Sequence, residues 1–147
     1  MVLEIANFKI SNLEKIIEIE KEAFPKKIAF SREAFEEFYF REPENFLVAK
    51  VGNEIVGYGI GKESKGKGEI ISVAVRENWR RKGIGTKIVE RLIENLKRKG
   101  ARKIFLHVRE KNEVAISFYQ KLGFKILKKI ENYYSNGDSA YLMNKNV

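Results

Sequence analysis

The sequence contains no cysteine and a single histidine, His107. The absence of cysteine excludes disulfides, thiolate metal sites and a cysteine nucleophile. One histidine is too few for a metal site built on several imidazole ligands, so we expect no bound metal.

Long apolar runs are also absent. No segment approaches the roughly 18 consecutive apolar residues that a membrane-spanning helix needs. The first residues lack the basic segment, apolar stretch and cleavage site of a signal peptide. We therefore expect a cytoplasmic protein with no membrane partner.

What is present fits one globular domain. The chain of 147 residues is long enough for a single core, and 44% hydrophobic with 33% charged residues is typical of globular proteins. No internal repeat, low-complexity tract or long linker divides it. We expect one domain over residues 1–147.

Positive charge is concentrated in one segment. Residues 76–103 contain eleven lysines and arginines against three acidic residues, a net of +8 out of the chain's +9. Such a segment can attract nucleic acid, an acidic membrane surface or a phosphorylated small molecule. A solvated helix face in a lysine- and glutamate-rich protein is the alternative that charge alone leaves open.

Hydrophobic periodicity predicts an ordered series of strands and helices. After a strand over 3–10, Ser11–Glu14 matches a capping box for a helix that ends at Phe24-Pro25. The later elements are a helix from Ser31, a hairpin of strands over 46–51 and 55–60, a turn over 61–68, a strand over 69–75, a helix over 84–100, a strand over 103–108, a helix over 112–122, and strands over 124–131 and 138–144. This order predicts an α/β (α+β) fold in which helices pack on a mixed sheet.

A basic turn separates the strand over 69–75 from the helix that begins near Ile84. It reads Arg80-Arg81-Lys82-Gly83-Ile84-Gly85-Thr86. Glycine lets the backbone approach a ligand and adopt positive φ, and the unpaired amides of a helix N-terminus attract anions. The residue order fits neither the Walker phosphate loop nor the dinucleotide fingerprint. From spacing alone, a phosphate site and an ordinary turn both stay open.

Two segments resemble the motifs of the GNAT acetyltransferases. In Ser72–Val75 followed by Trp79–Gly85, the residues Arg80, Gly83 and Gly85 match the family signature Arg/Gln-x-x-Gly-x-Gly/Ala. The stretch from Leu106 to Phe124 is similar to the family's second motif. The resemblance implies a single GNAT domain with a mixed, mostly antiparallel twisted sheet of about six to seven strands and about four helices.

The resemblance also implies a site for acetyl-CoA as the only cofactor. Its pyrophosphate would lie on the turn residues Arg80, Arg81, Lys82, Gly83, Ile84, Gly85 and Thr86. Its pantetheine would pair with the backbone of Val73, Ala74 and Val75 like an added strand. Asn112 would contact CoA, and Tyr119 would lie beside the sulfur and donate to the departing thiolate. From the residues alone, Asn112 is equally a helix cap and Tyr119 a half-buried aromatic.

The sequence determines the amine that accepts the acetyl group less clearly than the cofactor. At pH 7, neutralising a lysine amine costs about 4.6 kcal/mol, against about 1.4 kcal/mol for an α-amine, because their pKa values differ. Phe24-Pro25 and Tyr133-Tyr134 resemble features of the Nα-acetyltransferase branch, which includes bacterial RimI, archaeal N-terminal acetyltransferases and the NatE catalytic subunit. That resemblance implies a peptide site of the residues Phe24, Pro25, Ile28, Ile71, Tyr133 and Tyr134. Core packing of Phe24 and of the tyrosine pair is the structural alternative.

Two residues are candidates for the catalytic base. His107 occupies the position of the histidine base in NatE and titrates in the right pH range. Glu69 begins the strand before the basic turn, and strand alternation places Glu69, Ile71, Val73 and Val75 on one face. Glu69 is either a water-holding base or a solvated strand end, and the sequence leaves the choice between Glu69 and His107 open.

The sequence therefore predicts transfer of an acetyl group from acetyl-CoA to protein or peptide N-termini. Acetylation of a lysine or of a small-molecule amine is the alternative within the family. A nucleic-acid-binding module is a remote alternative, because no RNA-recognition signature is present. Ribosome association is left open, and we expect a monomer or a homodimer.

Overall fold

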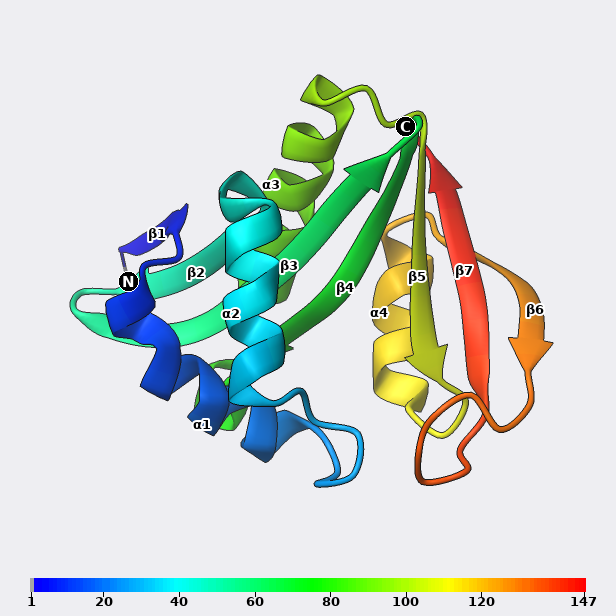
Figure 1. Ribbon diagram of the computed structural model, residues 1–147, viewed down its shortest axis with the longest axis horizontal. Coiled ribbons are helices and arrows are strands. Elements are labelled where there is room, and N and C mark those ends of the chain that lie inside the picture. Colours follow the sequence, from blue (N-terminus) through cyan, green and yellow to red (C-terminus); the bar gives the residue numbers. More distant parts are fainter. Residues whose placement is uncertain (1) are drawn as a thin grey trace.

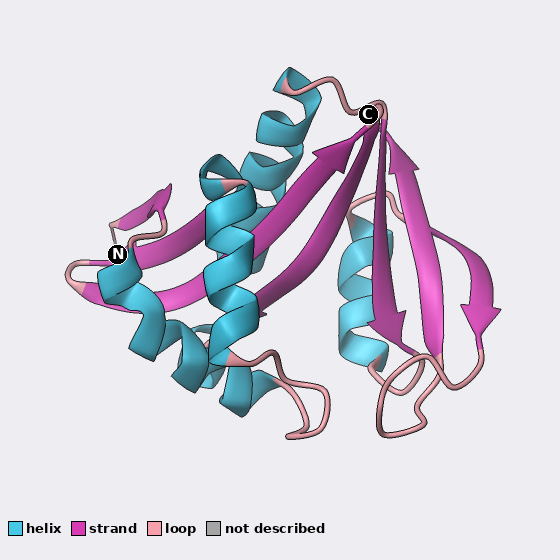
Figure 2. Ribbon diagram, viewed as in Figure 1, coloured by secondary structure: helices cyan, strands magenta, loops and turns pink. Residues whose placement is uncertain are grey.

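Seven strands form one sheet in the computed structural model, which describes residues 2–147 (Figures 1 and 2). Their order across the sheet is β1-β2-β3-β4-β5-β7-β6. The strands are β1 (Leu3–Asn7), β2 (Phe46–Val51), β3 (Glu54–Ser64), β4 (Lys67–Val75), β5 (Lys103–Arg109), β6 (Lys125–Ile130) and β7 (Ala140–Asn146). All neighbours are antiparallel except β4 and β5, which confirms a mixed, mostly antiparallel sheet.

Helices cover both faces of this sheet (Figure 1). The helices are α1 (Leu13–Ala23), α2 (Arg32–Arg41), α3 (Ile84–Arg98) and α4 (Glu113–Lys121), with short 3-10 helices η1 (Ile10–Asn12), η2 (Pro43–Asn45) and η3 (Glu77–Trp79). One buried cluster joins α1 and α2 to one face, and a second joins α3 and α4 to the other. A Cβ at Gly59 of β3 would lie 2.4 Å from Ile88 Cγ2, so only glycine lets α3 pack this closely. No helix within residues 2–147 is long and apolar enough to cross a membrane.

The largest departures from the predicted boundaries are at the first strand and at the turn over 61–68. The first strand stops at Asn7, and Ser11 is not a helix cap, because Asn12 Oδ1 accepts the Lys9 N–H at 2.8 Å and closes a 3-10 turn before α1. The predicted turn over 61–68 is wrong, since β3 and β4 continue to Ser64 and from Lys67. Cross-strand pairing and the 3.5 Å contact of Lys62 with Glu69 outweigh the weak strand propensity of glycine and lysine there.

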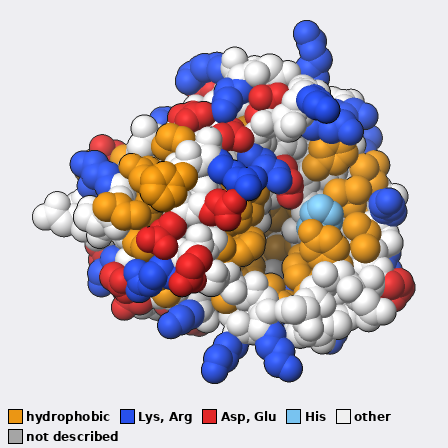
Figure 3. Space-filling model, viewed as in Figure 1, with side chains coloured by type: hydrophobic (Ala, Val, Ile, Leu, Met, Phe, Trp, Pro, Cys, Tyr) orange, Lys and Arg blue, Asp and Glu red, His pale blue; other side chains and the backbone are white. Residues whose placement is uncertain are grey.

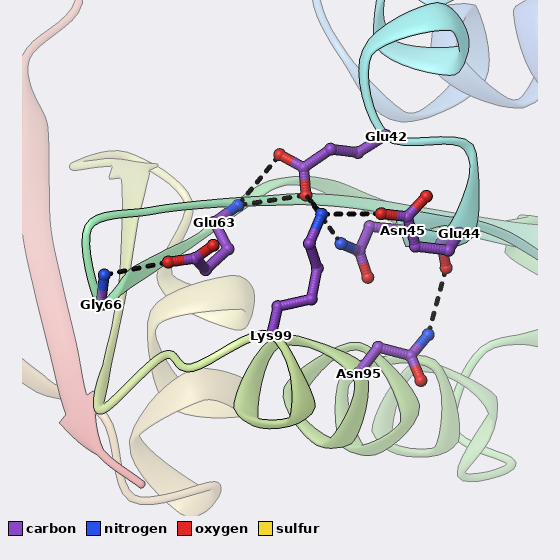
Figure 4. Close-up of polar contacts among 7 residues, drawn as sticks. All are labelled: Glu42, Glu44, Asn45, Glu63, Gly66, Asn95 and Lys99. Carbon is purple, nitrogen blue, oxygen red and sulfur yellow. Dashed lines mark hydrogen bonds and ion pairs between the residues drawn. The ribbon is translucent and has the colours of Figure 1, made fainter.

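The C-terminal end of α3 is held by a polar network (Figure 4). Lys99 Nζ lies 2.9 Å from Glu42 Oε1 and 2.7 Å from Glu44 Oε1. The hydrogen bonds with Glu44 and Glu42 raise the pKa of Lys99. The hydrogen bond from Lys99 lowers the pKa of Glu44. Glu42 also accepts the Glu63 N–H of β3 at 3.1 Å. The network ties the C-terminal end of α3 to β3 through Glu42.

The strands β4 and β5 separate along their length (Figure 1). They pair only at Lys67 with Lys103, Gly68 with Ile104, and Glu69 with Phe105. From Ile70 to Val75, β4 keeps its pairing with β3 but has none with β5. An unpaired strand edge therefore faces the space between the two strands, which is where the candidate site lies.

Candidate active site

A cleft of about 1160 Å³ opens between the separated strands. Figure 3 shows its mouth as a hollow with mostly apolar walls. Its lining includes every predicted site residue except Pro25 and Lys82. The structure thus brings together residues from the first helix, the centre of the sheet and the C-terminal loop.

A β-bulge at Ile71 divides the cleft into two sides. Ser72 pairs with Ile60, whereas Ile70 pairs with Gly61, so β4 has one residue more than β3 here. The predicted common face for Glu69, Ile71, Val73 and Val75 is therefore wrong. Val73 and Val75 pack against the core on the side of α3, and Ile71 packs on the side of α1 and α2.

The basic turn lies at the α3 side of the cleft. Gly83, the residue before α3, has φ +80°, a conformation that side chains with a Cβ rarely adopt. The first backbone bond of the helix runs from Lys87 N to Gly83 O at 3.1 Å. The amides of Ile84, Gly85 and Thr86 consequently have no intrahelical acceptor. Arg80, Arg81 and Lys82 are exposed beside them, so the turn presents donors and positive charge at one place.

Only part of the basic segment belongs to this turn. Arg76 pairs with Glu18 and Glu22 of α1, Arg98 pairs with Glu94, and Lys99 pairs with Glu42 and Glu44. Arg102 and Lys103 lie beyond the opposite end of α3. The surplus charge over 76–103 is therefore spread along the helix rather than gathered at one anion site.

Asn112 and Tyr119 line the cleft from the start and the end of α4. Asn112 Oδ1 accepts the Ala115 N–H at 3.1 Å, which confirms the capping interpretation. The side chain of Tyr119 is buried, and this burial, followed by the nearby Tyr134, raises the pKa of its phenol. Tyr119 therefore stays protonated and can donate a hydrogen bond into the cleft.

His107 and Glu69 lie on the side away from α3. The neighbours of His107 along β5, Leu106 and Val108, pack into the α3 core, so alternation turns His107 to the opposite face. Its Nδ1 lies 4.0 Å from Glu69 Oε2, too far for a direct hydrogen bond. Burial lowers the pKa of His107, and the charge of Glu69 opposes this shift. The imidazole is therefore neutral at pH 7 and can accept a proton.

Two loops form the mouth of the cleft on this side. The loop between α1 and α2 contributes Phe24 and Ile28, and the loop between β6 and β7 contributes Tyr133 and Tyr134. The ring of Tyr133 stacks on His107 at 4.5 Å between centroids.

The two loops are hydrogen-bonded to each other, and further hydrogen bonds hold each loop. Ser135 Oγ donates to Lys27 O at 2.5 Å across the mouth. Pro25 does not line the cleft, and its carbonyl instead accepts the amides of Ile28 and Ala29 at 2.9 Å each. Hydrogen bonds from Lys111, Asn136 and Arg109 lower the pKa of Asp138 to about 2, and Asp138 O accepts the Tyr134 N–H at 3.0 Å. These bonds give both loops a defined shape.

Glu20 is a cleft residue that the sequence analysis did not single out as a site residue. It is 2% exposed and lies on α1 among apolar side chains. Burial raises the pKa of Glu20 to about 7, against a hydrogen bond from the Phe30 amide that lowers it. The available signal was a carboxylate within the apolar stripe of an amphipathic helix.

Comparisons with known proteins agree with this geometry. The model of the family described as "Acetyltransferase (GNAT) family" matches residues 13–124. The chain is 34% identical to an N-alpha-acetyltransferase of Sulfurisphaera tokodaii, over 95% of this chain and 90% of the relative. It is 32% identical to N-alpha-acetyltransferase 30 of Schizosaccharomyces pombe, over 76% of this chain and 78% of the relative.

A solved structure, Ard1 from Thermoplasma volcanium, superposes with a TM-score of 0.93 and 28% identity, covering 100% of this chain and 99% of that one. The fold, the two motifs and the family match over most of the chain therefore agree. The chain belongs to the GNAT family and is an acetyl-CoA-dependent acetyltransferase.

Proposed function

We propose that the protein transfers the acetyl group of acetyl-CoA to the free α-amine of protein N-termini by direct attack within a ternary complex. The observation that carries this proposal is the single cleft between β4 and β5, which joins a phosphate-type turn on one side to a neutral His107 on the other. Two relatives over most of the chain are named N-alpha-acetyltransferases, which supports an α-amine as the acceptor.

The α3 side of the cleft fits the cofactor. The free amides of Ile84, Gly85 and Thr86, with the charges of Arg80 and Arg81, match a pyrophosphate. The edge of β4 from Val73 to Val75 has no pairing with β5 and offers backbone donors and acceptors to the amides of a pantetheine arm, although the Val75 carbonyl already accepts Arg80 Nε at 2.9 Å. Acetyl-CoA, when bound, supplies an acetyl group activated as a thioester.

On the opposite side, the cleft fits an amine. An α-amine with a pKa near 8 needs only a modest base, and neutral His107 is suited to that task. Glu69, at 4.0 Å from His107, can hold a water between the base and the amine. We assign Phe24, Ile28 and Ile71 to the wall for the first side chain, and Tyr133 and Tyr134 to the peptide backbone.

A matched pair of peptides tests the acceptor. One peptide carries a free N-terminus and no lysine, and the other has a blocked N-terminus and one internal lysine. We expect acetylation of the first peptide alone, measured as acetyl-CoA consumption and as peptide mass. Acetylation of the blocked peptide alone would instead identify a lysine acetyltransferase. Turnover of free polyamines with neither peptide modified would identify the small-molecule alternative.

Tyr119→Phe should lower kcat about 10- to 100-fold, because the variant removes a preorganised donor to the departing thiolate. The Kd for CoA should change little, since the ring remains in place. Steady-state kinetics and calorimetric CoA titration separate the two quantities. Tyr141→Phe, whose hydroxyl contacts Glu110 outside the cleft, is the matched control and should leave both unchanged. A Tyr119→Phe enzyme with full kcat would contradict the proposed role.

Ribosome association, a cytoplasmic location and a monomeric or homodimeric state stay predictions of the sequence. An independent readout for each is available: cosedimentation with ribosomes, cell fractionation, and light scattering of the purified protein.

A further inference from the structure

Glu20 uses both of its carboxylate oxygens in the interior. Oε2 accepts the Phe30 N–H at 2.8 Å, and Oε1 accepts the hydroxyl of Tyr58. Glu20 is 2% exposed and Tyr58 is 0% exposed. A carboxylate in such a place is costly to bury, and an apolar residue would fit the helix stripe at no such cost. Core packing alone therefore does not account for a glutamate at this position of α1.

One of these bonds fixes the loop between α1 and α2. The loop starts at Phe24, after the last turn of α1, and Glu20 holds the Phe30 amide, two residues before α2, across ten residues of the chain. The ring of Phe30 is edge-on to Phe38 at 5.2 Å and to Phe35 at 6.0 Å between centroids. Phe30 thus joins the loop to α1 through its backbone amide and to α2 through its ring, and Glu20 supplies the polar half of that anchor.

The other bond connects Glu20 to the central sheet. The Tyr58 hydroxyl lies 3.1 Å from Ser72 Oγ. Ser72 is next to Ile71, the bulged residue of β4, and both line the cleft. A continuous chain of hydrogen bonds therefore runs from the loop at Phe30, through Glu20 and Tyr58, to the strand at the bulge.

We propose that Glu20 is a positioning residue of the acceptor site, which holds the loop over 24–30 in register with the bulge of β4. Through this register Phe24 and Ile28 of the loop and Ile71 of the strand form one wall. The inference rests on the proposed function for the meaning of that wall, although the anchoring itself does not depend on the acceptor. Glu20 touches neither the amine nor the acetyl group in this role.

Glu20→Ala should raise the KM for a free-N-terminus peptide about tenfold and change kcat and the Kd for CoA by less than about threefold, because displacement of a substrate-binding wall mainly weakens acceptor binding. Glu20→Gln should restore KM to within about threefold of the wild type. Its amide oxygen can accept from Phe30, and its NH₂ can donate to Tyr58, whose proton then turns to Ser72. Ile19→Val, at a fully buried position of the same helix, is the control for a purely structural loss and should leave KM unchanged.

Hydrogen exchange gives a readout that needs no acceptor. The Phe30 amide should be protected in the wild type and in Glu20→Gln, and should exchange at least about tenfold faster in Glu20→Ala. Tyr58→Phe removes the hydroxyl that joins Glu20 to Ser72 but leaves the bond between Glu20 and the Phe30 amide, so it should keep the Phe30 protection while raising the peptide KM about threefold.

Unchanged Phe30 exchange in Glu20→Ala would overturn the proposal whatever the acceptor is. An unchanged peptide KM in both Glu20→Ala and Tyr58→Phe would also overturn it. If only lysine peptides are acetylated while Phe30 exchange responds as expected, the N-terminal assignment fails and the anchoring by Glu20 stands. All measurements use the full chain well below its Tm.

Discussion

His107→Ala is expected to lower kcat about a hundredfold, which is the lower range of what a positioned general base contributes. Burial keeps the imidazole neutral, and it lies on the acceptor side of the cleft with Glu69 at 4.0 Å. The Kd for CoA should stay within about twofold of the wild type, because only an interaction of the transition state is removed. Initial rates at saturating acetyl-CoA and peptide, with a separate CoA titration, measure both quantities.

The pH dependence of kcat tests whether His107 acts as the base. Burial lowers the pKa of His107 below its ordinary value of 6.5, so the neutral base predominates at pH 7 and is lost as the pH falls through the lowered pKa. An extra loss of rate below pH 6.5 is therefore expected in the wild type and should be absent from His107→Ala. Glu69 raises the pKa of His107, so Glu69→Gln should move this loss to still lower pH.

A loss of stacking rather than of the base is the main alternative explanation for a slow His107→Ala. The imidazole is nearly parallel to the ring of Tyr133, with an angle of 13°. His107→Phe retains an aromatic surface for Tyr133 and removes the nitrogen, and it should be as slow as His107→Ala. Recovery of kcat in His107→Phe would show that position 107 acts through Tyr133. If His107→Ala and Glu69→Gln both keep full turnover, neither residue is the base.

Arg81→Glu should weaken CoA binding about 10- to 100-fold at low salt, because it replaces an attractive charge at the turn with a repulsive one. Arg81 lies between Arg80 and Lys82, immediately before the free amides of α3, and is exposed. The effect should shrink as salt is added, since exposed charges are screened within about 8 Å at physiological ionic strength. Calorimetry of CoA binding at two salt concentrations measures it.

The matched control for this prediction is Arg102→Glu. It makes the same change in net charge on an exposed residue of the same basic segment, but beyond the far end of α3. We expect little change in CoA affinity for Arg102→Glu. Equal losses in the two variants would mean that net charge, rather than the turn, sets the affinity.

Much of the fold was predictable because its signals are local. Asn112 and Ser31 cap α4 and α2 as their sequence positions indicate, and Phe24-Pro25 ends α1. The turn before α3 was predictable for the same reason, since its glycine spacing and charge occupy consecutive residues. A short segment therefore carries enough information to specify a helix start, whereas the CoA role proposed for the turn rests on the family resemblance as well as on its spacing.

The errors in the central strands share a different cause. The bulge at Ile71 and the extension of β3 and β4 past Gly61 and Gly68 depend on which residues the neighbouring strand presents. The prediction of alternating faces assumed that β4 runs without a bulge. The extra residue of β4 at the bulge instead puts Glu69 on the face opposite Val73. Such register is a property of two strands together, and neither strand encodes it alone.

The sequence, read with its family resemblance, was enough to predict the cofactor half of this enzyme, because the residues proposed to face the cofactor lie mostly in the turn from Arg80 to Thr86 and in the strand before it. Only the tertiary structure decided how the residues proposed for the acceptor half come together. The separation of β4 from β5, the contact of Ser135 with Lys27, and the chain from Glu20 through Tyr58 to Ser72 join residues that are 14 to 108 positions apart. Their partners are brought together only by packing of the whole sheet and its helices, so no local pattern could specify them.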